Sequence, residues 1–66
     1  MSAAHPVTRA YRRRARTRSA LIIAARNLFG ERGIDAVTIQ DITDAADVGK
    51  GSFYYHFDSK EEVLQA

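Results

Sequence analysis

Apolar residues recur at helical spacing in the stretch from Arg16 to Arg32. The pattern i, i+1, i+4, i+7, i+8 covers about 120° of arc on a helix. The residues that form it are Leu21, Ile22, Ala25, Leu28 and Phe29. Gly33 follows the last turn, and glycine takes a left-handed conformation after a helix without strain. The pattern therefore predicts a first helix over 16–32 that buries one face.

A second helix is predicted to start at Thr38, because Thr38 and Asp41 have the spacing of a capping box. An acidic side chain in the first turn also favours the helix dipole. The pattern breaks at 47–49, so this helix is only about two turns long. Its expected buried side consists of Ile39, Ile42, Ala45 and Ala46.

A tight turn joins this helix to a third one, which is the arrangement of a helix-turn-helix. The third helix is predicted over 50–56, and Phe53 and Phe57 are expected to point inward because they lie four residues apart. Small residues at 45–46 let the two helices approach closely, while Val48 fills the space between them. In this geometry the later helix projects from the body and can enter the major groove of DNA.

A fourth helix opens at Ser59, which forms a second capping-box pattern with Glu62. Its first apolar positions are Val63 and Leu64. No stretch of the sequence has the alternating pattern of a strand. We therefore expect an all-α fold, a three-helix bundle with a helix-turn-helix plus the start of a fourth helix.

Length and composition narrow the classes of protein to which the chain can belong. Its 66 residues suffice for one small domain. The absence of cysteine excludes a disulfide scaffold and a thiolate zinc site. The longest apolar run, Ala20–Ala25, is too short to span a membrane. The sequence shows no nucleophile beside a base and an orienting acid, so we expect no enzyme, no cofactor and no metal.

Positive charge is concentrated at the start of the chain. Residues 1–18 contain six arginines and no acidic residue, whereas residues 19–66 contain four basic and eight acidic residues. A basic segment of this kind favours a polyanion, with nucleic acid ahead of an anionic membrane surface. An organelle transit peptide fits less well, because apolar residues are few and form no stripe. We predict a flexible basic arm over 1–14 and a helix-turn-helix domain over 15–66, with contacts to DNA from Arg12, Arg13, Arg14 and Arg16.

Five groups of residues between Leu21 and Ala66 follow one another in a characteristic order. They are Leu21-Ile22-x-Ala24-Ala25-x-x-Leu28-Phe29, Gly33 with Thr38, Ala46-x-Val48, Lys50-Gly51-x-Phe53-Tyr54-x-His56-Phe57 and Lys60-Glu61-x-Val63. Over these 46 of its 66 residues the chain resembles the DNA-binding domain of the tetracycline-repressor (TetR) family of transcription regulators. It departs from the family pattern at three places: Thr43 replaces a common alanine, and Asp47 and Gly49 replace the usual glycine and serine of the turn.

The resemblance implies contacts to DNA from the second half of the chain. It places Thr38, Tyr54, His56 and Lys60 at backbone phosphates and Lys50, Ser52 and Tyr55 at base edges, while Gly51 allows a close approach of the backbone. Lys60 opposes the dipole at the start of its helix, which indicates a functional demand. Two alternatives stay open: Tyr54 as a core aromatic with its hydroxyl at the surface, and His56 as a surface histidine at a helix end.

We therefore expect sequence-specific binding to double-stranded DNA by the DNA-binding domain of a transcriptional regulator. The resemblance implies a cytoplasmic, nucleoid-associated repressor that binds a palindromic operator and is released by a small-molecule inducer. It also implies a C-terminal domain that binds the inducer and forms the homodimer. That domain is absent from this chain, so a homodimer is expected only of the full-length protein. The alternative function is a helical protein-interaction or RNA-binding module that uses the arginine-rich arm.

Overall fold

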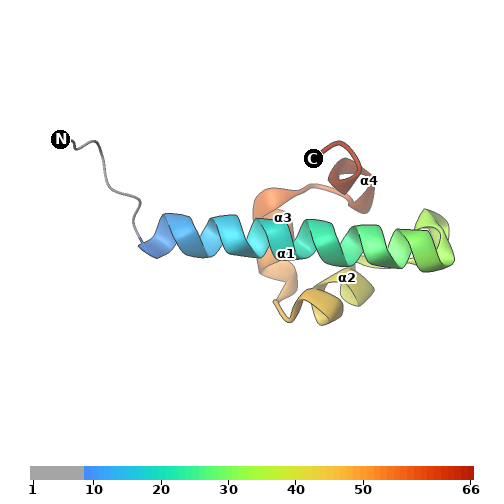
Figure 1. Cartoon of the computed structure of the whole chain (residues 1–66), viewed down its shortest axis with the longest axis horizontal. Helices are drawn as coiled ribbons and strands as arrows, with labels where there is room; N and C mark the ends of the chain where they lie inside the picture. The colour runs from blue at the N-terminus through green and yellow to red at the C-terminus, as the bar shows by residue number, and fades with distance from the viewer. Residues whose placement is uncertain (1–8) are drawn as a thin grey trace.

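The computed structural model describes residues 9–66, which form four α-helices and one short 3-10 helix. The elements in chain order are α1 (Arg9–Arg32), η1 (Ile34–Ala36), α2 (Ile39–Ala46), α3 (Lys50–His56) and α4 (Lys60–Val63). The long helix α1 runs along the length of the molecule, and the shorter helices gather beside its middle and its C-terminal part (Figure 1). The described residues contain no strand, and the predicted all-α fold with a helix-turn-helix is confirmed.

Helix α1 begins at Arg9, seven residues before the start that the apolar pattern predicts. The prediction of a flexible arm over 1–14 is therefore wrong for 9–14, while 1–8 lie outside the described residues. Arginine and alanine are good helix formers, so this polar stretch extends the helix without contributing an apolar face. Contacts of Arg14 and Arg18 with aromatic rings near the end of α3 also support the extension.

A single apolar core joins α1 to the elements that follow it. Fully or almost fully buried side chains come from α1, α2, α3, α4 and the segments between them: Leu21, Ala24, Ala25, Val37, Ile42, Phe53, Phe57 and Val63. The predicted inward orientation of Phe53 and Phe57 is thus confirmed. The core fixes both short helices of the helix-turn-helix against α1.

Gly33 ends α1 as predicted, but in a different conformation. Its φ is 83° and its ψ is 150°, a region of extended backbone that is open almost only to glycine, rather than the left-handed helical region. Its N–H donates to the carbonyl of Phe29 at 2.8 Å. The chain therefore leaves α1 in an extended step and enters η1 directly.

The turn between α2 and α3 has the geometry that its sequence indicates. Asp47 lies in the left-handed region with φ 60° and ψ 47°, and Gly49 is the N-cap of α3 without a side-chain hydrogen bond. The Val48 N–H donates to the Thr43 carbonyl at 3.0 Å, and its side chain packs against the core. The two departures from the usual family turn are therefore accommodated locally.

The buried face of α2 differs from the prediction at one position. Ala45 is exposed, whereas Thr43 is 1% exposed. Thr43 satisfies its hydroxyl within the helix, because Oγ1 donates to the Gln40 carbonyl at 3.1 Å. Threonine can occupy this buried position because its methyl group packs in the core while its hydroxyl finds a partner on the backbone.

Helix α4 is capped differently from the reciprocal box that its sequence indicates. Ser59 Oγ accepts from the Glu62 N–H at 3.4 Å, but the Glu62 carboxylate accepts from the Asp58 N–H at 2.9 Å instead of the Ser59 N–H. Val63 is buried as expected, whereas Leu64 is 54% exposed. The helix is therefore attached to the core through a single apolar side chain in its last turn.

Candidate nucleic-acid interface

Helix α3 is attached to the body by one side and exposes the other. Phe53 is completely buried and packs against Phe57, with ring centroids 5.6 Å apart. Tyr54 and Tyr55 are 53% and 65% exposed. The alternative of Tyr54 as a core aromatic is thus not what the structure shows. The seven-residue helix presents its polar and aromatic side chains to solvent between two shallow hollows.

The first hollow lies between α3 and the starts of α2 and α4. It brings together Thr38, Lys50, Tyr54 and Lys60, four of the residues for which the sequence predicts contacts to DNA. Gln40 also lines this hollow, and the sequence analysis did not single it out. Gln40 lies in the first turn of α2, two residues after the predicted N-cap Thr38, and this position could have indicated it.

The capping box at Thr38 is present as predicted. Thr38 Oγ1 accepts from the Asp41 N–H at 3.0 Å, and the Asp41 carboxylate accepts from the Thr38 N–H at 3.0 Å. The hydrogen bond that the Asp41 carboxylate accepts from the Thr38 N–H lowers the pKa of this carboxyl below its usual value, with further effects of the Thr38 hydroxyl and of the Arg32 guanidinium 3.4 Å away. The Thr38 hydroxyl thus accepts in this box and also interacts with the Asp41 carboxylate, and the predicted phosphate contact of Thr38 stays a prediction.

Lys60 has a structural role that the sequence did not reveal. Its Nζ donates to the carbonyls of Ile34 and Val37, both at 2.7 Å, and thereby ties the start of α4 to the segment around η1. These contacts account for a cation at a helix N-terminus, where the dipole is unfavourable. An ammonium group has three donors, so one is left over, and the predicted phosphate contact of Lys60 stays a prediction.

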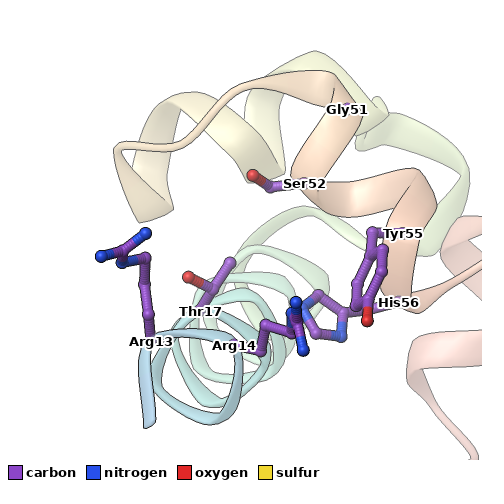
Figure 2. Close-up of a pocket in the computed structure, with 7 residues that line it drawn as sticks. All are labelled: Arg13, Arg14, Thr17, Gly51, Ser52, Tyr55 and His56. Atoms are coloured by element: carbon purple, nitrogen blue, oxygen red, sulfur yellow. The ribbon is translucent and has the colours of Figure 1, made fainter. Parts of the chain in front are cut away.

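The second hollow lies between α1 and α3 and has a volume of about 260 Å³. Figure 2 shows that residues from the basic part of α1 face residues from α3 across it. The lining residues are Arg13, Arg14, Thr17, Gly51, Ser52, Tyr55 and His56. The structure therefore brings two of the predicted arginines to the same surface as four predicted residues of the third helix.

Two cation–π contacts connect the arginine-rich part of α1 with α3. The guanidinium carbon of Arg14 lies 5.6 Å from the centroid of the Tyr55 ring, and that of Arg18 lies 5.4 Å from the centroid of the Phe57 ring. Arg18 and Thr17 were not predicted as site residues. They lie three and four residues after Arg14, so they would have been predicted on the same side if the helix had been extended back to Arg14.

His56 is half-buried beside these arginines rather than free at the surface. Its ring meets the Tyr55 ring edge-on, with centroids 4.9 Å apart. Burial lowers the pKa of His56, and the positive charges of Arg18 and Arg14 lower it further. The imidazole is therefore neutral at neutral pH and can either donate or accept a hydrogen bond.

The remaining predicted arginines lie on a different side of α1. Arg12 and Arg16 are one helical turn apart and share a side, about 200° around the helix from Arg14 at 100° per residue. Both are exposed. The structure therefore divides the predicted arginines into a pair beside α3, Arg13 and Arg14, and a pair that faces away from it.

A helix-turn-helix with exposed tyrosines on its second helix and basic residues on both sides of it is typical of a DNA-binding protein. Residues 21–66 match the family described as bacterial regulatory proteins, tetR family. The chain belongs to this family, and the matched segment is its N-terminal DNA-binding domain. The DNA-binding function that the sequence predicts is thereby confirmed.

Proteins from several bacteria are similar to this chain, among them transcription regulators. The repressor KstR2 of Rhodococcus jostii is 51% identical over 47 residues, which are 71% of this chain and 23% of that protein. The TetC protein of transposon Tn10 from Escherichia coli is 46% identical over 50 residues, 76% of this chain and 25% of that protein. The regulator TtgR of Pseudomonas putida is 42% identical over 50 residues, 76% of this chain and 24% of that protein. No solved structure matches the chain.

The chain spans about a quarter of the length of the curated relatives that it matches. Its family is one of transcription regulators rather than of enzymes. Among residues 9–66, no helix combines the length and the apolar character that crossing a membrane requires.

Proposed function

We propose that this domain binds an operator by placing α3 in the major groove of double-stranded DNA. The observation that carries the proposal is the position of α3, whose exposed tyrosines line two hollows. Arg13 and Arg14 border one of them, and Lys50 and Lys60 share the other with acidic side chains. A recognition helix needs this arrangement, because contacts to phosphates on both sides position it while its own side chains reach the base edges.

The proposed roles follow the two sides of α3. Lys50, Ser52 and Tyr55 read base edges, and Gly51 lets the backbone come close to the groove. Tyr54, with Thr38 and the remaining donor of Lys60, contacts phosphates at the first hollow. His56 contacts a phosphate at the second hollow, together with Arg13 and Arg14.

The arginines of α1 act as part of a helix in this proposal, because residues 9–14 are helical. A helix does not enter the minor groove as a flexible arm does. We therefore propose that Arg12, Arg13, Arg14 and Arg16 contribute contacts to the phosphate backbone that are largely independent of sequence.

The whole regulator is proposed to be a cytoplasmic, nucleoid-associated repressor. KstR2 carries the word repressor in its name, and IcaR of Staphylococcus epidermidis is a negative transcriptional regulator of a biofilm operon. We propose a homodimer of the full-length protein on a palindromic operator, and release by a small molecule that binds a further domain. A dimer suits the geometry, since one helix-turn-helix covers one half-site and two copies bind about one helical turn apart.

The salt dependence of binding tests the role of the arginines. Arg12, Arg13 and Arg16 are replaced by glutamine, and the dissociation constant for a duplex is measured over a range of salt concentrations. The slope of log affinity against log salt should become shallower by about 0.9 for each phosphate contact that is lost. Deletion of 1–18 is the poorer experiment, because it also removes Arg14 and Arg18, which contact α3 and its C-cap. An unchanged slope in the triple variant would mean that these arginines contact no phosphate.

A second experiment separates base reading from positioning. Lys50→Ala should relax the preference at particular base pairs by about 1–3 kcal/mol if the contact is direct. Tyr54→Phe removes only a hydroxyl and keeps the ring, which packs edge-on against Phe53 at 5.6 Å. It should weaken binding to cognate and random DNA by similar factors. A base-specific effect of Tyr54→Phe, or none of Lys50→Ala, would contradict the proposed roles.

A third experiment concerns assembly. Two copies of the chain, joined by a linker that spans two half-sites, should bind a palindrome far more tightly than one copy, because the second contact becomes intramolecular. A single copy should bind a duplex with two half-sites no more tightly than a duplex with one. A free chain that sediments as a stable dimer would show that these 66 residues carry their own assembly surface.

A further inference from the structure

Tyr55 is the most exposed aromatic side chain of α3, and yet it is held from one side. It is 65% exposed, so the core does not fix its ring. Among the described residues, the Arg14 guanidinium contacts its ring, with its carbon 5.6 Å from the ring centroid, and so does the edge-on ring of His56, with centroids 4.9 Å apart. Arg14 belongs to α1 and lies far from Tyr55 in the sequence, so the contact exists only in the folded domain.

The position of Tyr55 makes this contact decisive for the orientation of the ring. Tyr55 lines two neighbouring hollows, and Arg14 lines the same two. One hollow contains Arg13 and Ser52, and the other contains Tyr11, Ala15 and Ser19. Tyr55 and Arg14, with His56, which also lines both, thus form the boundary between the two hollows. Without Arg14, only the edge of the His56 ring would restrain the Tyr55 ring within the described part of the chain, and the location of the Tyr55 hydroxyl would be less well defined.

Arg14 is suited to holding a ring in place. A guanidinium group is planar and weakly hydrated, and it stacks on aromatic faces better than an ammonium group does. Arg14 shares its side of α1 with Arg18, one turn later, whose guanidinium carbon lies 5.4 Å from the centroid of the buried Phe57 ring. This second contact fixes α1 relative to the end of α3, so that Arg14 itself is held at a defined place.

We infer that Arg14 determines base specificity indirectly, by orienting the Tyr55 ring against the base edge that Tyr55 reads. The inference rests on the proposed function of α3 as the helix that reads bases. Binding groups must be held within about 0.5 Å of their productive position to be selective. An arginine outside the recognition helix thereby contributes to the choice of sequence and not only to the overall affinity.

The test compares two arginines that carry the same charge but differ in their contacts. Arg14→Gln and the matched control Arg12→Gln each remove one positive charge from α1, and Arg12 lies about 200° around the helix from Arg14. The 66-residue chain and its variants are bound at low salt to a pool of duplexes with randomised sequence, and the bound DNA is sequenced. This gives the base preference at each position of the half-site.

Both variants should lose affinity for all sequences to a similar extent. Only Arg14→Gln should also lose preference, about two- to fivefold at one base pair, the size expected for an exposed cation–π contact. Tyr55→Ala should lose preference at the same base pair, and adding Arg14→Gln to it should cause no further loss there. Arg14→Lys should keep the salt dependence of the wild type and recover only part of the preference, because lysine keeps the charge without the planar group.

Three results would overturn the inference. They are full base preference in Arg14→Gln, a loss of preference at a base pair that Tyr55→Ala leaves unchanged, and a loss of preference in Arg12→Gln as large as that in Arg14→Gln. If Arg14→Gln unfolds, Arg14→Lys still tests the inference. Full base preference in Arg14→Lys would contradict a role of the planar guanidinium group. A wild-type chain without any base preference would instead refute the proposed function, and the inference with it.

Discussion

Replacement of Lys60 by methionine removes an ammonium group while it keeps an unbranched side chain of similar length. The structure gives this group two partners, the carbonyls of Ile34 and Val37, each 2.7 Å from Nζ. The partners lie 26 and 23 residues earlier in the chain. Lys60 therefore closes a long loop and joins α4 to the segment that leads into α2.

The expected cost follows from the kind of hydrogen bond that is lost. A hydrogen bond with a charged donor contributes about 1.5–3 kcal/mol to stability. The two bonds of Lys60 share one donor group at a half-buried site, where water can replace part of the contact. We therefore expect a total loss of about 1.5–3 kcal/mol rather than twice that amount. A domain of this size has about 3–5 kcal/mol in all, so Lys60→Met should remove about half of its stability.

Urea unfolding followed by far-ultraviolet circular dichroism measures this effect. Lys50→Met is the matched control, because Lys50 is an exposed lysine at the same position of a neighbouring helix. The midpoint should fall strongly for Lys60→Met and little for Lys50→Met, with the same slope in urea for both. Equal midpoints for the two variants would refute the reasoning. A large difference would also mean that DNA binding by Lys60→Met must be compared at equal folded fractions.

Three further predictions concern the half-buried histidine, the glycine that ends α1 and the N-cap of α2. The pKa of His56 lies below its ordinary value of 6.5, so the unfolded chain takes up a proton at a higher pH than the folded one does. The free energy of unfolding should therefore fall as the pH drops through 6.5 and level off below the folded pKa. His56→Gln should remove this part of the pH dependence in urea titrations. Gly33→Ala should cost about 1–3 kcal/mol through the backbone alone, because an added Cβ would meet no atom within 4 Å; a thermal melt unchanged from that of the wild type would argue against the φ of 83°. Thr38→Ala should cost about 0.5–2 kcal/mol by loss of the N-cap, whereas Thr38→Ser should keep the cap and most of the stability in the same melts.

The sequence by itself determined the local features of this domain. Thr38 and Asp41 form their capping box, Gly33 ends the first helix, and the third helix spans 50–56 as its pattern predicts. Each of these features depends on a few neighbouring residues, whose hydrogen bonds span three or four positions along the chain. The motifs from Leu21 to Ala66 also sufficed to identify the family.

The start of α1 required the tertiary structure. Residues 9–15 carry no apolar stripe, so periodicity could not distinguish a polar helix from a flexible arm. The contacts that accompany the extension, Arg14 with Tyr55 and Arg18 with Phe57, join residues that lie about 40 positions apart in the sequence. Only the packing of α3 against α1 brings them together.

Two other outcomes depended on packing in the same way. Thr43 is buried where Ala45 was expected, because the crossing of α2 over the core is rotated from the face that the alanines suggest. Lys60 reaches two carbonyls more than 20 residues away. Short-range patterns specify which segments become helices, but the partner of a long polar side chain is decided by the elements that the fold places within its reach.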